Sequence, residues 1–249
     1  MWKNIEEFVN KIGEATLLFL RALAIIFIHP PKLRHILKQM EEIGVNAAVL
    51  IAITGFFMGG VIVIEIYPTF HKFNAEFLMG AVVSISLSRE LSPVLVALLV
   101  TARSGSAMSA NIGTMRITEQ IDALEVLAVD PVRYLIAPRL IAAFFMVPAL
   151  TILSIASGVI GGYIISTEFF NVNPFIYWER MKDLTELYDI IGGVIKSVVF
   201  GISLTMVACY FGYTASGGAE GVGKATTKGV VVASVLILVL DYFLTPLIF

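Results

Sequence analysis

Charged side chains interrupt the apolar stretches of this 249-residue sequence, and four of them are the residues best able to do chemistry. Arg89 and Glu90 lie near the middle of one stretch, Lys196 lies early in another, and Glu65 lies late in the first. A charge at the bilayer centre costs about 2.5–3.5 kcal/mol on the insertion scale, so such residues usually mark a substrate or ion pathway. They predict a binding site for an amphiphile or an ion, or a buried ion pair that fixes helix register. Asp241, in the last apolar stretch, fits neither role clearly.

Pro93 lies four residues after Arg89 in the same stretch. Because proline has no N–H, the carbonyl of residue 89 loses its helical hydrogen bond, and we expect a kink and a free acceptor at the charged site. A polar stripe on the same helix precedes Pro93 and consists of serines at four-residue spacing, Ser84, Ser88 and Ser92.

Other chemistries find little support in the sequence. Residues 218–224 match the start of a phosphate-binding loop, G-x-x-x-x-G-K, but Ala225 stands where Ser or Thr must bind Mg²⁺, so we expect a flexible turn there instead. The three histidines have no metal-ligand spacing, the single Cys209 forms no intrachain disulfide, and G-x-S-x-G does not occur. The sequence therefore predicts no catalytic residue, no metal site and no cofactor in this chain.

The composition is typical of a membrane protein. Apolar residues make up 58% of the sequence and charged residues 14%, and the mean hydropathy is +0.90. Soluble domains are about 45–50% apolar and about 25% charged, so a soluble enzyme is excluded. A net charge of −2 gives no reason to expect nucleic acid as a partner.

The expected fold is an all-α membrane protein of a single domain, residues 1–249, with an N-terminal interfacial helix and five transmembrane helices. Apolar stretches of about 20 residues, the length that crosses a bilayer, occur at 46–66, 77–102, 140–166, 190–213 and 229–249. In residues 1–31 the apolar run of 14 is too short to cross, while Ile5, Phe8, Val9 and Ile12 recur at helical spacing. These features predict an amphipathic helix that lies in the membrane interface.

Two polar segments separate the spans. Residues 103–139 contain a predicted amphipathic helix at 118–127, and residues 167–189 are polar and aromatic. If the N-terminus is inside the cell, twelve Lys and Arg residues face the cytoplasm and three face outward. The positive-inside rule therefore predicts that the segment 103–139 is cytoplasmic and that the segment 167–189 and the C-terminus are external. Small residues at four-residue spacing, such as Gly55/Gly59 and Gly158/Gly162, predict close helix packing within one bundle, or else a dimer seam.

The cytoplasmic segment carries the strongest family signal. The runs 102–107, 112–131 and 137–139 resemble the signature of the MlaE/YrbE permease family, with further matches at 88–93, 195–200, 225–227 and 240–245. The resemblance covers about residues 30–249. Its members are membrane subunits of ABC transporters that work with MCE-domain proteins, and the resemblance implies a homodimer of five-span subunits in the bacterial inner membrane.

The resemblance also implies roles for individual residues. A lipid cavity at the dimer interface would be lined by Arg89, Glu90, Lys196, Ile62, Glu65, Tyr67, Phe70 and Phe73. Glu65 and Phe73 depart from the neutral amide and the tyrosine of relatives. Coupling to the ATPase would fall to Arg116, Glu119, Asp122, Ala123, Leu124 and Glu125.

The implied mechanism is transfer of a phospholipid between the membrane and a periplasmic MCE-protein ring, a hexamer, which maintains outer-membrane lipid asymmetry. Two separate ABC ATPase subunits would bind ATP and Mg²⁺, and a STAS-domain protein is a further possible partner. Three alternatives stay open: the same transporter with a sterol or fatty-acid cargo, an ion-coupled secondary transporter, and a scaffold that transports nothing. An ion-coupled transporter expects inverted repeats, into which five spans do not divide equally.

Overall fold

The computed structural model describes residues 2–249, with the side chains of residue 10 and residues 12–249. Every regular element in this described range is helical. Five helical units are long and apolar enough to cross a membrane, at Leu33–Lys72, Glu76–Ile117, Val132–Phe169, Leu187–Tyr213 and Gly218–Ile248. The predicted all-α membrane fold with five spans is therefore confirmed.

Several of these units combine α-helix with short π-helical turns, and the second unit begins with a 3-10 turn, η2. The first unit consists of α2 (Leu33–Met40), η1 (Glu41–Val45) and α3 (Asn46–Lys72). The second consists of η2 (Glu76–Leu78), α4 (Met79–Ser86), η3 (Leu87–Leu91), α5 (Ser92–Val100), η4 (Thr101–Gly105) and α6 (Ser106–Ile117). The third consists of η5 (Val132–Ile136), α8 (Ala137–Ile164) and η6 (Ile165–Phe169). The fourth is α10 (Leu187–Tyr213), the fifth is α11 (Gly218–Ile248), and α7 (Gln120–Val126) and α9 (Pro174–Leu184) lie in the connections.

The first three units are longer than the predicted spans. Each has 38–42 residues, which at 1.5 Å per residue is about 60 Å, twice the hydrocarbon thickness of a bilayer. The predicted spans mark only the apolar part of each helix, whereas helical hydrogen bonding continues into the polar flanks. Thus the second helix extends past residue 102 to Ile117, where Met108 and Ile112 are buried.

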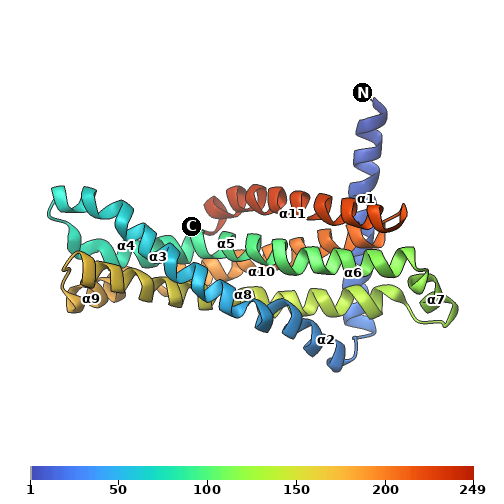
Figure 1. The fold of residues 1–249 in the computed structure, drawn as a ribbon, viewed down its shortest axis with the longest axis horizontal. Coiled ribbons are helices and arrows are strands. Elements are labelled where there is room, and N and C mark those ends of the chain that lie inside the picture. Colours follow the sequence, from blue (N-terminus) through green and yellow to red (C-terminus); the bar gives the residue numbers. More distant parts are fainter. Residues whose placement is uncertain (1) are drawn as a thin grey trace.

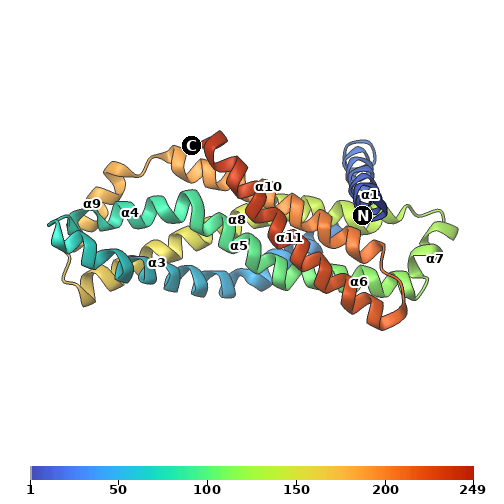
Figure 2. The ribbon, with the colours of Figure 1, turned by 90° about the horizontal axis from the view of Figure 1, so that it is seen from above.

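The N-terminal helix α1 (Trp2–Ile28) lies across the bundle. Figure 1 shows α1 running across one end of the horizontal bundle, and Figure 2 shows the same helix nearly end-on. Arg21 pairs with Asp130 at 3.1 Å, and the Tyr210 hydroxyl donates to Glu14 at 2.9 Å, so α1 is attached to two other elements. This orientation is the one expected of an interfacial helix. The side chains of Ile5, Phe8 and Val9, on which that prediction depended, lie outside the described side chains.

Glycines bring α3 and α8 into close contact within one protomer. A Cβ atom on Gly59 would overlap the carbonyl oxygen of Gly158, and one on Gly161 would overlap that of Phe56. A small side chain at these positions lets the two backbones approach, as small-residue faces do in membranes. The small-residue pairs therefore serve packing inside the bundle, as the first of the two interpretations predicted.

One local expectation needs shorter bounds and another is wrong. The helix predicted at 118–127 is present as α7, and it is shorter because Glu119 adopts a left-handed conformation (φ 58°) before it and Ala128 does so (φ 57°) after it. Leu127 is consequently exposed rather than packed. The glycine-rich run expected to be a flexible turn forms the first turns of α11, where Lys224 pairs with Glu220 at 2.6 Å across one helical turn.

Candidate functional site: an ionic cluster within the spans

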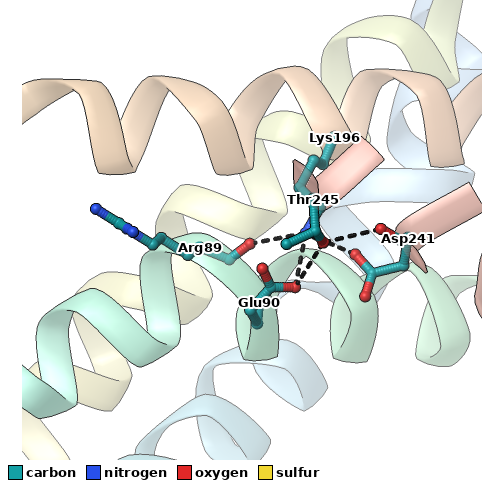
Figure 3. Close-up of polar contacts among 5 residues, drawn as sticks. All are labelled: Arg89, Glu90, Lys196, Asp241 and Thr245. Atoms are coloured by element: carbon teal, nitrogen blue, oxygen red, sulfur yellow. Dashed lines mark hydrogen bonds and ion pairs between the residues drawn. The ribbon is translucent and has the colours of Figure 1, made fainter. Parts of the chain in front are cut away.

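Lys196 on α10 is the centre of a cluster of polar groups from three spans (Figure 3). Its ammonium donates to Glu90 Oε2 at 2.7 Å, to the carbonyl oxygen of Arg89 at 3.1 Å and to Thr245 Oγ1 at 2.9 Å. A second carboxylate, Asp241 Oδ1, lies 2.7 Å from the same nitrogen. We call Arg89, Glu90, Lys196, Asp241 and Thr245 the Lys196 cluster.

The backbone around Pro93 creates the acceptor that Lys196 uses. The turn before Pro93 is the π-helical η3, and the carbonyl of Arg89 accepts from the Lys196 ammonium at 3.1 Å. Gly193 allows this approach, since a Cβ atom there would overlap the carbonyl oxygen of Ser88. Lys196 is one turn further along α10. The carbonyl at residue 89, predicted to be a free acceptor, thus has Lys196 as a side-chain partner.

Arg89 is held by a carboxylate that the sequence analysis did not single out. Its guanidinium lies 2.6 Å from Asp189 Oδ1, and the ring of Phe249 lies 4.9 Å from its central carbon. Asp189 is buried, and its other oxygen accepts from the backbone N–H of Glu186 in a capping box at the start of α10. The Glu186-x-x-Asp189 spacing was the available signal for this residue.

The exposure of the cluster is uneven. The Lys196 side chain is fully buried, whereas Glu90 retains 38% and Arg89 41% of their side-chain exposure. Lys196 therefore anchors the cluster, and the charged ends of Arg89 and Glu90 reach the protomer surface at the level of the apolar helices. A guanidinium and a carboxylate placed this way can bind a polar head group by hydrogen bonds. Nothing in the arrangement resembles a nucleophile activated by a base.

Asp241 now has a place in the cluster. With Glu90 it gives Lys196 two carboxylate neighbours, so the ionised trio carries one excess negative charge. Asp241 and Thr245 both come from α11, where the Thr245 hydroxyl also donates to the carbonyl of Asp241 at 2.8 Å. The sequence could not assign Asp241, because its partner is 45 residues away on another helix.

Among the described side chains, no hydrogen bond or ion pair joins the predicted acyl-chain residues to the Lys196 cluster. Tyr67 stacks on Phe170 with ring centres 3.8 Å apart, and Ile62 and Phe70 pack with it around Val63. Glu65 and Phe73 are exposed, and among the described side chains no hydrogen bond or ion pair joins Glu65 to the cluster. One protomer thus brings Arg89, Glu90 and Lys196 together but leaves the 62–73 group as a separate surface.

The serine stripe faces the inside of the bundle. Ser84, Ser88 and Ser92 are all buried, and the Ser154 hydroxyl of α8 donates to Ser92 Oγ at 3.3 Å. These hydroxyls therefore contribute to packing between α4, α5 and α8.

Much of the bundle surface is apolar. Along α11 the exposed side chains include Val232, Val235, Val239, Tyr242 and Phe243, and α3 exposes a similar row. In water such faces would be unstable, so they must contact lipid or protein. Within the described residues no group of His, Cys, Asp and Glu could hold a metal ion.

The predicted coupling residues form a short projecting element at the end of the bundle that carries α1. Arg116 of α6 pairs with Asp122 of α7 at 2.7 Å and fixes the turn between the two helices. Leu124 is half-buried and anchors α7, whereas Glu119, Ala123 and Glu125 are exposed. Val126 and Leu127 follow as an exposed apolar tip. This element can dock on another protein.

Five apolar helical units, an ionic cluster within them and the short projecting helix α7 define a multi-pass membrane protein of the permease class. Residues 36–247 match the family described as Permease MlaE. The chain belongs to the MlaE permease family.

Its relatives carry matching names. A probable ABC transporter permease protein of Rickettsia typhi is 40% identical over 247 residues, which is 99% of this chain and 95% of the relative. The intermembrane phospholipid transport system permease protein MlaE of Haemophilus influenzae is 38% identical over 252 residues, covering 99% and 95%. The chloroplastic protein Trigalactosyldiacylglycerol 1 of Arabidopsis thaliana is 35% identical over 216 residues, covering 87% and 62%.

Proposed function

We propose that this chain is the membrane-spanning subunit of an ABC transporter that moves phospholipids. The observation that carries the proposal is the Lys196 cluster, which presents the Arg89 guanidinium and the Glu90 carboxylate at the surface of apolar helices. A zwitterionic or anionic head group could bind these charges while its acyl chains contact the helices. The name of the Haemophilus relative, a phospholipid transport permease, supports the same cargo.

A second copy of the chain would complete the lipid cavity. Arg89 and Glu90 are open to the outside of the single protomer, as are Glu65 and Phe73. A surface that is partly charged and otherwise apolar is costly to leave against lipid tails, and a facing copy would enclose it. We therefore propose a homodimer with the cavity between the two protomers, where the 62–73 surface supplies the contacts to acyl chains.

Energy would come from partner chains, since the G-x-x-x-x-G-K run of this chain lies in the helix α11 and not in a phosphate-binding loop. Two cytoplasmic ABC ATPase subunits would bind ATP and Mg²⁺ and would dock on α7 through its exposed residues, including Glu119 and Glu125. Movement of α7 would reach the spans through the Arg116–Asp122 ion pair. The positive-inside rule then puts the N-terminus in the cytoplasm and the C-terminus in the periplasm.

The resemblance to the MlaE family extends the proposal to the remaining partners. In the bacterial inner membrane, the transporter would exchange phospholipid with a periplasmic MCE-protein ring and so maintain outer-membrane lipid asymmetry. A STAS-domain protein would be an accessory subunit on the ATPase side.

Reconstitution with the partner ATPase tests the proposal. Proteoliposomes that contain both chains are expected to show ATPase turnover that depends on added phospholipid, and ATP-dependent movement of a fluorescent phospholipid. If sterol or fatty acid stimulated ATPase turnover as much as phospholipid does, the assignment of phospholipid as the cargo would have to change. ATPase co-purification with no lipid dependence would favour a scaffold, and movement driven by an ion gradient without ATP would favour a secondary transporter.

A further inference from the structure

Arg139 at the start of α8 is a buried cation without an acidic partner. The residue retains only 6% of its exposure. Its guanidinium donates to the carbonyl of Leu135 at 2.6 Å and to Asn111 Oδ1 at 3.0 Å, which are both neutral acceptors. Among the described side chains no carboxylate oxygen lies within 4.0 Å of it. Burial of an unpaired charge is costly, so a counter-ion at this place would stabilise the protein.

Arg139 lines two adjoining cavities of about 230 and 320 Å³ between α2, η1, α6 and α8. Gln39, Glu42 and Asn111 line both cavities as well. We call the combined space the Arg139 cavity. It is too large for one water molecule, whose share of liquid volume is about 30 Å³.

Three buried polar atoms at this cavity have no partner within the described residues. They are Arg139 Nε, Gln39 Oε1 and Ser104 Oγ. Buried polar groups are nearly always hydrogen-bonded, so three orphans at one cavity indicate a missing bound group. Arg139 Nε is a donor, a serine hydroxyl can donate, and the Gln39 amide can present its N–H groups if it turns over.

The charges around the cavity select the sign of that group. Lys38 and Arg103 add two positive charges to that of Arg139, against the single negative charge of Glu42. His35 also lines the cavity, and its ring contacts the ring of Tyr134. Tyr134 in turn lines a neighbouring pocket together with Ile25, near the end of α1, and His29, which follows α1. An anion bound here would therefore lie near the helix expected to mark the membrane interface.

We propose that the Arg139 cavity binds a phosphate-type oxyanion, supplied either by a lipid head group in the leaflet beside α1 or by free inorganic phosphate. Arginine is suited to this role because its planar donors match the oxygens of phosphate. The site is distinct from the Lys196 cluster, and it does not depend on the proposed transport function.

The test uses the purified full-length protein in a neutral detergent. The first arm measures Tm as inorganic phosphate replaces chloride at constant ionic strength. The second arm counts bound phosphatidylglycerol by native mass spectrometry. At phosphate or lipid about tenfold above Kd, we expect Tm to rise by roughly 3–6 °C.

Gln39→Glu is the informative variant, because it places a carboxylate in the same cavity as Arg139. It should fold at least as well as the parent, with an equal or higher Tm without ligand, and it should lose the response to the anion. Gln120→Glu adds the same charge on exposed α7 and should respond as the parent does. As a second variant, Ser104→Ala removes one orphan atom without changing charge and should raise Kd several-fold.

The two arms identify the source of the anion. A phosphate-dependent rise in Tm with unchanged lipid counts assigns free phosphate. The loss of one phosphatidylglycerol per chain in Gln39→Glu assigns a lipid head group. The proposal is overturned if phosphate leaves the Tm of the parent unchanged and the parent binds no phosphatidylglycerol, or if Gln39→Glu responds as Gln120→Glu does.

Discussion

Replacing Lys196 by methionine should destabilise the protein, because this one ammonium is the shared cation of two carboxylates inside the spans. Methionine keeps the volume of the side chain but removes the positive charge. In the variant, Glu90 and Asp241 lose a cation that lies 2.7 Å from each of them, and the carbonyl of Arg89 loses its donor.

The expected loss follows from the burial of the partners. Removing one partner of a buried ion pair costs about 3–5 kcal/mol, because the other charge stays buried and unpaired. Lys196 is fully buried, but the Glu90 and Asp241 side chains keep 38% and 21% of their exposure, so the lower end applies. A loss of about 3 kcal/mol corresponds to a drop in Tm of roughly 6–12 °C for a chain of 150–250 residues.

Thermal unfolding of the purified protein in detergent measures this drop, and a triple variant supplies the control. Lys196→Met with Glu90→Gln and Asp241→Asn removes all three charges at nearly constant shape, so it should recover at least half of the lost Tm. A single variant that loses less than 2 °C, or a triple variant no more stable than the single one, would refute the charge balance proposed for the cluster.

Three further predictions concern other parts of the molecule. Glu125→Lys on exposed α7 should insert normally but lose stimulation of the partner ATPase, and full lipid transfer by this variant would contradict the coupling role. Gly193→Ala should cost about 2 kcal/mol in thermal unfolding because its Cβ atom would overlap Ser88, whereas Gly223→Ala, which has open space, should cost nothing; equal losses would contradict the close approach of α10. Burial raises the pKa of Tyr177 on α9 well above its ordinary value, while in the unfolded chain the group ionises near pH 10. Stability should therefore fall above pH 10 by an amount that Tyr177→Phe abolishes, and identical alkaline profiles would contradict this.

The sequence predicted the parts of the fold that depend on hydrophobicity and local chemistry. Five apolar stretches indicated five spans, and Pro93 pointed to the carbonyl of residue 89, which accepts from Lys196. Both follow from rules that act over a few residues. The helix ends were less predictable: residues 103–117 are polar in places, yet they stay helical because Met108 and Ile112 pack into the bundle.

The partners within the site were not predictable in the same way. Asp189 and Asp241 are 100 and 45 residues from Arg89 and Lys196, and only the packing of α10 against η3 and α11 brings them together. The separation of the 62–73 surface from the Lys196 cluster likewise depends on where α3 runs in the bundle. Hydropathy reports how well a segment fits the membrane, but it does not report which neighbour a segment contacts.

The most direct test of the lipid-binding account is the phospholipid retained by the purified protein, measured by native mass spectrometry. Arg89→Gln alone would strand the buried Asp189, so the variant should be Arg89→Gln with Asp189→Asn, which removes both charges of the pair. Arg116→Gln with Asp122→Asn removes a matched pair far from the cluster and is the control. The account predicts that the control keeps its phospholipid and that the Arg89 variant loses most of it while staying folded. Equal phospholipid on both folded variants would contradict the account.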